Sequence, residues 1–180
     1  MVYHSIEEIF GALDATRARL TASVEGLGEG QEHFRPSPDR WSIADICEHL
    51  AMAEAGSVKL FDKLLQKAEA EGRVRAEGDP FAPVSLGEQA ERHRGQKFQA
   101  PDPLRPTGRA PLADSLASLQ DSLERLRALR PRIERADCAE QRFPHPAFGP
   151  LNLYQWLLFT AAHEERHLAQ IEALKAEMKG

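Results

Sequence analysis

Residues 163–167 have the sequence His-Glu-Glu-Arg-His, and they lie inside an apolar stretch that runs from Leu151 to Leu174. Histidines four positions apart share one face of an α-helix, so the two imidazoles can bind the same metal ion. Apolar residues before and after them recur at steps of three and four, which puts both histidines on the apolar face. The stretch therefore predicts a long helix that carries two metal-binding side chains toward the interior.

The same five residues also match the H-E-x-x-H pattern of zincin metallopeptidases, in which the glutamate activates water. A zincin needs a third ligand, but residues 168–173 are Leu-Ala-Gln-Ile-Glu-Ala and lack the Gly and His of the extended metzincin pattern. Glu172 and Glu177 belong to the same predicted helix, so neither can fold back toward the histidines. A zincin peptidase is therefore the least favoured interpretation.

Helical periodicity recurs in three more segments, and no segment shows sustained strand alternation. The four predicted helices span residues 5–26, 42–71, 111–135 and 152–178. Ser5, Ser42 and Asn152 are each suited to cap the first turn of a helix. Pro131 is expected to end or kink the third helix, because proline lacks the N–H of a helix interior.

Residues 73–110 are expected to form an irregular crossover, because they contain five prolines and four glycines. Within them, Ser85-x-x-Glu88 can cap a short helix. The predicted architecture is a single all-α domain over residues 1–180, a four-helix bundle with a long crossover between its second and third helices. The middle two helices of such a bundle can run parallel.

Composition excludes several classes of function. The formal net charge of the 180 residues is −5 and no Lys/Arg cluster forms a stripe, so nucleic acid is not an expected partner. Cys47 and Cys138 are too few for a disulfide framework and fit a reducing compartment. The longest apolar stretch, Leu153 to Ala162, is too short to span a membrane, and the first residues lack a signal peptide's apolar core. A cytoplasmic protein without membrane segments is expected.

A third histidine, His49, shares one face of the second predicted helix with Ile46, Leu50, Ala53 and Ser57. Burying three imidazoles without partners is costly, whereas one divalent metal ion satisfies a nitrogen on each. Three protein ligands leave open coordination positions, which is typical of a catalytic site. The alternative interpretation is that these are hydrogen-bonded core histidines.

Other residues have less specific interpretations. Glu164 is a candidate catalytic base, but its position beside His163 turns it about 100° around the helix, where it can also be solvated. Gln170 is a candidate hydrogen-bond partner of the site, and Trp156 can line the pocket. Cys47 is expected in the core. The remaining histidines are expected at solvated ends or loops: His4, His33, His93 and His145.

Three motifs together are similar to those of the DinB-like (YfiT-related) superfamily. They are Trp-Ser-Ile-Ala-Asp-Ile-Cys-Glu-His-Leu at 41–50, His-Pro-Ala-Phe-Gly-Pro-Leu at 145–151 and His-Glu-Glu-Arg-His-Leu-Ala-Gln-Ile at 163–171. The resemblance implies a four-helix bundle with a long crossover, often a homodimer. It also implies a divalent metal, commonly nickel or zinc, bound by His49, His163 and His167.

The resemblance leaves the reaction open. Superfamily members include thiol-dependent S-transferases with bacillithiol-type cofactors, a mycothiol-dependent maleylpyruvate isomerase and metal-dependent hydrolases. The expected function is transfer of a low-molecular-weight thiol to an electrophilic small molecule, or a related hydrolysis. The alternative is a non-catalytic, metal-stabilised dimeric bundle that binds or senses a ligand.

Overall fold

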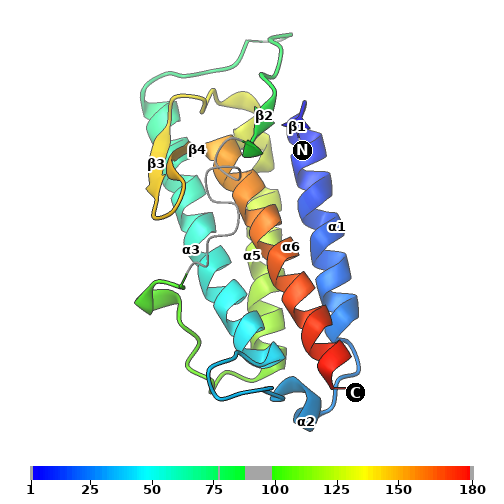
Figure 1. Ribbon diagram of the computed structural model, residues 1–180. Coiled ribbons are helices and arrows are strands. Elements are labelled where there is room, and N and C mark those ends of the chain that lie inside the picture. Colours follow the sequence, from blue (N-terminus) through cyan, green and yellow to red (C-terminus); the bar gives the residue numbers. More distant parts are fainter. Residues whose placement is uncertain (1, 77, 88–98, 179–180) are drawn as a thin grey trace.

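Four long helices make up the body of the molecule, which the computed structural model describes over residues 2–76, 78–87 and 99–178 (Figure 1). They are α1 (Ile6–Val24), α3 (Ile43–Ala70), α5 (Leu112–Arg135) and α6 (Leu153–Glu177). The other elements are short: α2 (Glu29–Glu32), the 3-10 turn η1 (Asp102–Leu104), and the strands β1 (Val2–Tyr3), β2 (Val84–Ser85), β3 (Arg142–His145) and β4 (Gly149–Asn152). The helix bounds lie within two residues of the predicted ranges, and the all-α class is confirmed.

The helices run in two parallel pairs: α1 and α6 in one direction, and α3 and α5 in the other (Figure 1). Arg132, near the end of α5, pairs with Asp62 and Glu69 near the end of α3, at 2.6 and 2.8 Å. These ion pairs require the two helices to end side by side. The long crossover makes this topology possible, because it carries the chain from the end of α3 back to the start of α5.

Local sequence signals fix the helix starts. Ser42 accepts from the backbone N–H of Asp45, whose carboxylate accepts from the N–H of Ser42, and this reciprocal pair begins α3. Asn152 and Gln155 form the same kind of box at the start of α6. Each box satisfies two backbone N–H groups that the helix leaves without partners.

Pro131 does not end its helix, contrary to one of the two expected outcomes. It lies inside α5, which continues for one more turn to Arg135. A proline removes one backbone hydrogen bond, but near a helix end little of the ladder follows it. Ile133, in that last turn, is fully buried, and its packing favours continuation of the helix.

The apolar core is divided into two clusters along the bundle axis. One includes Leu13 of α1 and Val58 of α3, and the other includes Leu20 of α1 and Leu168 of α6. A buried ionic cluster lies between them, and it consists of Arg17, Glu54 and Glu164. The Arg17 guanidinium also donates to the carbonyl of Leu119, so it links all four long helices.

The described part of the crossover is attached to α3 near its start. The Glu48 carboxylate accepts from the Thr107 hydroxyl at 2.6 Å and from the Gly108 N–H at 3.0 Å. At the other end of the crossover, β2 pairs with β1. The cap expected at Ser85-x-x-Glu88 lies partly outside the described residues, since residues 88–98 are not among them.

An antiparallel hairpin, β3–β4, occupies residues that showed no strand periodicity. Its strands are short, and Pro144 pairs with Pro150 across them. Prolines at both positions hide the strand signal, because proline is uncommon in strands. Gly149 has a φ of +71°, a conformation that favours glycine at this turn.

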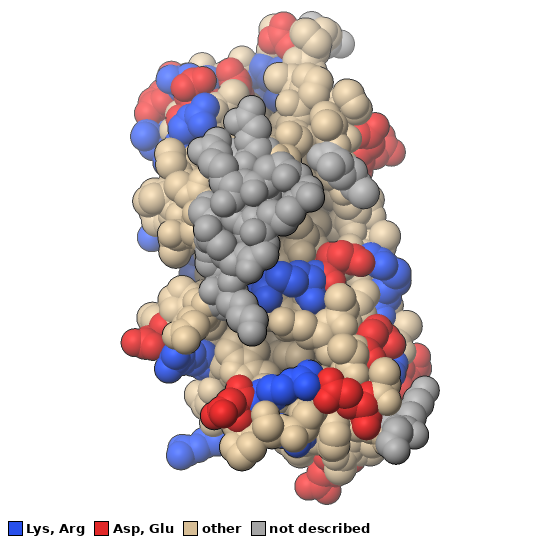
Figure 2. Space-filling model, viewed as in Figure 1, with Lys and Arg blue, Asp and Glu red and all other residues tan. Residues whose placement is uncertain are grey.

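The described surface in Figure 2 intermixes basic and acidic side chains, without a large area of one sign on that face. Exposed ion pairs between distant segments contribute to this pattern, such as Arg40, in the loop before α3, with Glu177 of α6 at 2.8 Å. Among the described residues, no helix combines the length and apolarity needed to cross a membrane.

Candidate metal centre

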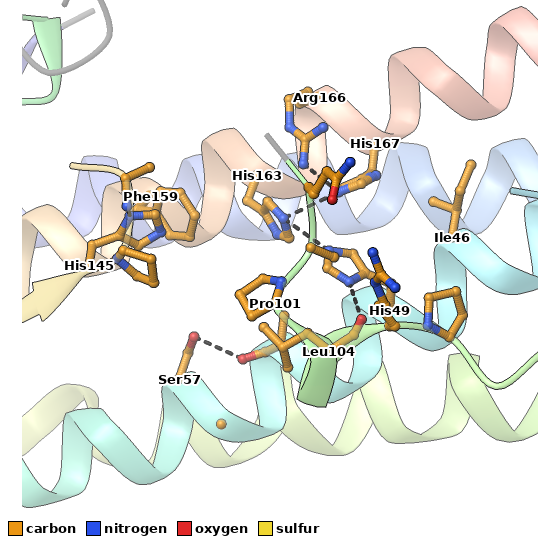
Figure 3. A pocket seen from close by; sticks show the side chains of 18 of the residues that line it. Ile46, His49, Ser57, Pro101, Leu104, His145, Phe159, His163, Arg166 and His167 are labelled. Atoms are coloured by element: carbon orange, nitrogen blue, oxygen red, sulfur yellow. Dashed lines mark hydrogen bonds between the residues drawn. The ribbon is translucent and has the colours of Figure 1, made fainter. Parts of the chain in front are cut away.

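Three histidines from two helices meet at one point in the structure (Figure 3). His49 comes from α3, and His163 and His167 come from consecutive turns of α6. The Nε2 atom of His163 lies 3.2 Å from Nε2 of His49 and 3.2 Å from Nε2 of His167. The ligand atoms of all three residues lie within 4.8 Å of one another. The fold thus brings together the three residues that the sequence singled out.

The other ring nitrogens have their own partners. Nδ1 of His49 lies 2.7 Å from the carbonyl oxygen of Leu104, and Nδ1 of His167 lies 2.7 Å from Oε1 of Gln170. Both partners are acceptors, so each Nδ1 must carry the proton and donate it. In a neutral imidazole the Nε2 atom then keeps its lone pair. This is the tautomer that leaves Nε2 available to a metal.

Burial keeps these imidazoles neutral. Desolvation lowers the pKa of His163 to about 2 and that of His167 to about 3, and neighbouring positive charge adds to both shifts. The pKa of His49 is also lowered, chiefly by burial. Metal ligation requires the deprotonated form of histidine, so the environment favours the ligating state over a wide pH range.

The geometry fits a bound cation. Nitrogens of a tetrahedral zinc site, with Zn–N bonds of 2.0–2.1 Å, are about 3.3 Å apart. The two observed contacts of 3.2 Å are close to that value. A proton on Nε2 of His163 can be donated to only one of its two neighbours, whereas a cation satisfies all three lone pairs. The donor set of three imidazoles suits zinc and nickel among the divalent metals.

The three histidines lie on the wall of a large cavity of about 1400 Å³ between α3, α6, the end of the crossover and the β3–β4 hairpin. On one side of them, rings form a continuous wall: Phe143, His145, Phe148, Trp156 and Phe159. Phe159 stacks on His163 with ring centroids 5.3 Å apart. The cavity therefore gives a small molecule access to the histidines along an apolar surface.

Glu164 does not lie beside the three histidines. Its side chain is 1% exposed and points into the core, where its Oε1 accepts from Nε of Arg17 at 2.7 Å. Neither the expectation of a base at the site nor that of a solvated carboxylate matches this position. The physical reason is that α6 is buried on two faces, one toward the cavity and one toward α1. The sequence contained a signal for this, because Glu164 falls in the core stripe of Leu157, Ala161, Leu168 and Ile171.

The remaining expectations have mixed outcomes. Cys47 is fully buried, and desolvation raises the pKa of its thiol to about 12, as suits a core residue. Trp156 lines the cavity and Gln170 contacts His167, as expected. His145 is not a solvated loop residue, because it lies in the aromatic wall with its ring centroid 4.3 Å from that of Phe159. His93 lies outside the described residues.

Arg166 is a cavity residue that sequence reasoning missed. Its Nη2 lies 2.7 Å from Nε2 of His167, so the guanidinium donates to the lone pair at the centre of the cluster (Figure 3). Arg166 lies between the two histidines of α6 in the sequence, and the apolar periodicity of this segment did not predict that its side chain faces the site. Only the position of the cavity relative to α6 shows that it faces the site.

Comparisons with known proteins agree with this fold. The chain is 26% identical over 157 residues to YuaE, an uncharacterized protein of Bacillus subtilis strain 168, which covers 87% of this chain and 90% of YuaE. The structure is similar to YfiT of Bacillus subtilis, described as a probable metal-dependent hydrolase with an unusual four-helix bundle topology. The TM-score is 0.62 at 21% identity, covering 96% of this chain and 87% of YfiT. It is also similar to the four-helix bundle protein TT2238, with a TM-score of 0.58 at 22% identity, covering 93% and 98% of the two chains.

At these identities the similarity to the two solved structures shows only the fold, which is a four-helix bundle. The family is decided by sequence. The model of the DinB superfamily matches residues 12–171, a range that contains the three histidines and all of the long helices except the first six residues of α1 and the last six of α6. The chain therefore belongs to the DinB superfamily.

Proposed function

We propose that this chain is a divalent-metal-dependent enzyme in which His49, His163 and His167 bind the ion. The observation that carries the proposal is the convergence of three Nε2 atoms within ligating distance of a common point. Two of these atoms are held as lone-pair donors by the hydrogen bonds that their Nδ1 atoms make. Zinc or nickel is the proposed metal.

The proposed reaction is transfer of a low-molecular-weight thiol to an electrophilic small molecule, or a closely related hydrolysis. A divalent cation with three protein ligands has open positions and lowers the pKa of a thiol or water bound there. The description of YfiT as a probable metal-dependent hydrolase supports the second branch. A homodimer in the cytoplasm remains part of the proposal.

The protein's own side chains supply position rather than a nucleophile. Leu104 and Gln170 fix the ring orientations of His49 and His167. Cys47 is buried, away from the cavity, and its raised pKa keeps the thiol protonated, so it is unsuited to nucleophilic attack. Asp39 is the one carboxylate among the described residues that line the cavity. The nucleophile is therefore proposed to come from the thiol or from water.

The experiment compares zinc-loaded, nickel-loaded and chelator-treated protein for conjugation of thiols to monochlorobimane and for hydrolysis of p-nitrophenyl acetate. Turnover is expected only in metal-loaded protein and should be lost in His163→Ala. The matched control is His33→Ala, because His33 is an exposed residue at the end of α2 and does not line the cavity. Turnover that survives both chelation and His163→Ala would refute the proposal.

A non-catalytic role for the metal has one observation in its favour. The hydrogen bond from His49 to Leu104 connects the site to the crossover, so an ion would join α3, α6 and the crossover. In that case chelation should lower the melting temperature strongly while no substrate is turned over. A catalytic site should instead lose turnover with a smaller change in melting temperature.

A further inference from the structure

The walls of the cavity differ in chemistry from one side to the other. The hairpin and the first half of α6 contribute the aromatic wall, which reaches the metal site directly through the stacking of Phe159 on His163. Phe143, at the outer edge of this wall, is 47% exposed although it is a large apolar side chain. An apolar group of a ligand can therefore be bound from the cavity mouth up to the histidines.

Charged groups on the cavity lining are mostly basic. Arg40 is paired with Glu177, and Arg105 lies 3.6 Å from Asp102. Lys59, Lys63 and Arg166 also line the cavity, and within the described part of the chain no carboxylate pairs with them. Positive charge on the lining is thus left without a carboxylate partner among the described residues, and such charge attracts anions.

Arg166 is the closest of these cations to the proposed metal. Its guanidinium contacts Nε2 of His167, which is the same lone pair that a metal ion would use. A metal and a guanidinium cannot both take that lone pair, so metal binding would release Arg166 toward the cavity. The released side chain would stay next to the open coordination positions, because it is anchored on α6 between two of the ligands. Guanidinium groups bind carboxylates and other oxyanions with paired hydrogen bonds.

We infer that the cavity binds a small molecule with both an apolar, flat group and an anionic group, and that Arg166 selects it by binding the anion while the aromatic wall binds the flat group. This inference rests on the proposed function, since it identifies the class of ligand for that site. The anion can belong to the thiol or to the electrophile. In either case the selecting residue is Arg166, and Lys59 and Lys63 at the cavity lining add attraction.

The test uses two fluorescent probes with the same ring system, 8-anilinonaphthalene-1-sulfonate and the neutral N-phenyl-1-naphthylamine. Their dissociation constants are measured on zinc-loaded protein for wild type, Arg166→Gln and Arg166→Lys. Arg130→Gln is the matched control, because Arg130 is an arginine of α5 that does not line the cavity. Zinc content is measured for every variant.

Arg166→Gln should raise the dissociation constant of the sulfonate probe about tenfold and that of the neutral probe less than about twofold. Arg166→Lys should restore part of the difference, and Arg130→Gln should have no effect. Equal weakening of both probes by Arg166→Gln, or no weakening of the sulfonate probe, would overturn the inference. Probe binding needs no turnover, so a protein that selects the anion through Arg166 but is catalytically silent would refute only the proposed function.

Displacement of the probe then identifies which reactant carries the anion. Mercaptoacetate is compared with mercaptoethanol, and phenylacetate with 2-phenylethanol, on the same zinc-loaded protein. If the thiol carries it, mercaptoacetate should compete better than mercaptoethanol in wild type but not in Arg166→Gln. If the electrophile carries it, the second pair should show that difference. Neutral competitors as good as the anionic ones in both pairs would overturn the inference.

Discussion

Nδ1 of His49 lies 2.7 Å from the main-chain oxygen of Leu104, so a proposed metal ligand of α3 is held in place by the crossover. The crossover is itself attached to α3 through the adjacent residue, because Glu48 accepts hydrogen bonds from Thr107 and from the N–H of Gly108. These hydrogen bonds hold the pKa of the Glu48 carboxyl below its usual value against the effect of its burial. The orientation of His49 therefore depends on a segment far from it in sequence.

Replacing Glu48 with Gln should loosen this attachment. A glutamine offers one acceptor oxygen and a donor N–H₂ group, whereas Thr107 and Gly108 both donate. Hydrogen exchange measured by mass spectrometry should become faster in residues 101–110, while peptides from α5 stay unchanged. Asp121→Asn, at an exposed position of α5, is the control and should leave the exchange of 101–110 as in wild type. Unchanged exchange in Glu48→Gln would show that the attachment does not depend on this carboxylate.

Gln170 should tune the affinity for metal, because its Oε1 accepts the Nδ1–H of His167. Gln170→Leu removes that acceptor, and loss of such a partner weakens metal binding about 10- to 100-fold. Competition with a chromogenic chelator measures the change. Gln120→Leu is the control, since Gln120 is an exposed residue of α5 that bonds only Glu124 among the described residues. Equal affinities in wild type and Gln170→Leu would contradict the role of this hydrogen bond.

Acid should destabilise the metal-free protein through the histidines. The folded pKa values of His163 and His167 are lowered to about 2 and about 3, below the usual 6.5. Below about pH 6.5 the unfolded chain therefore binds protons that the folded chain does not, so stability is present above that pH and is lost as the pH falls. With two such groups, the free energy of unfolding should fall by about 3 kcal/mol for each pH unit below pH 6.

Urea unfolding of chelated protein at pH 7, 6 and 5 measures this dependence. The double variant His163→Gln, His167→Gln should have a distinctly shallower pH dependence than wild type. Comparison of the two proteins cancels the contributions of carboxylates, which are the same in both. Parallel curves over this range would mean that the folded protein accommodates the charged imidazoles.

The buried ionic cluster predicts an opposite dependence at higher pH. Burial raises the pKa of Glu54 to about 8, and the second carboxylate, Glu164, adds to the effect because Arg17 carries only one positive charge. A raised folded pKa means that the stability contributed by this carboxyl is present below about pH 4.5 and is lost as the pH rises to about 8. Oε1 of Glu54 also lacks a hydrogen-bond partner among the described residues.

Glu54→Gln keeps the shape of the side chain but removes the titrating group. Its stability relative to wild type should therefore rise between pH 5 and pH 9, as measured by urea unfolding of the two proteins. Arg17→Met should instead cost about 3–5 kcal/mol at pH 7, because it leaves the buried carboxyl groups of Glu54 and Glu164 without their shared cationic partner. Glu124→Gln, at an exposed site, is the control with no expected pH-dependent difference. A constant difference between Glu54→Gln and wild type over this range would contradict the raised pKa.

Much of the fold was predictable because its signals are local. The boxes at Ser42 and Asn152 mark the starts of α3 and α6, and the periodicity that follows them places His49 and His167 in the interior. The resemblance of three separated motifs to the DinB-like superfamily then predicted that histidines of both helices bind the same metal ion. The meeting of the Nε2 atoms, by contrast, depends on the packing of α3 against α6, which no local pattern determines.

Three features escaped prediction for stated physical reasons. The β3–β4 hairpin is rich in proline, which hides strand periodicity, and with it the place of His145 in the aromatic wall was missed. The inward direction of Glu164 follows from a second buried face of α6, and its ionic partner Arg17 lies on α1. The approach of Arg166 to His167 depends on where the cavity opens.

The central claim is that His49, His163 and His167 bind one divalent ion, and metal content per chain tests it most directly. Tag-free protein and a His49→Ala, His163→Ala, His167→Ala variant are analysed by inductively coupled plasma mass spectrometry, as purified and after dialysis against zinc or nickel. We expect a stoichiometric divalent ion in the wild type and its loss in the variant. A wild type that is purified without metal and also fails to bind added zinc and nickel would contradict the claim.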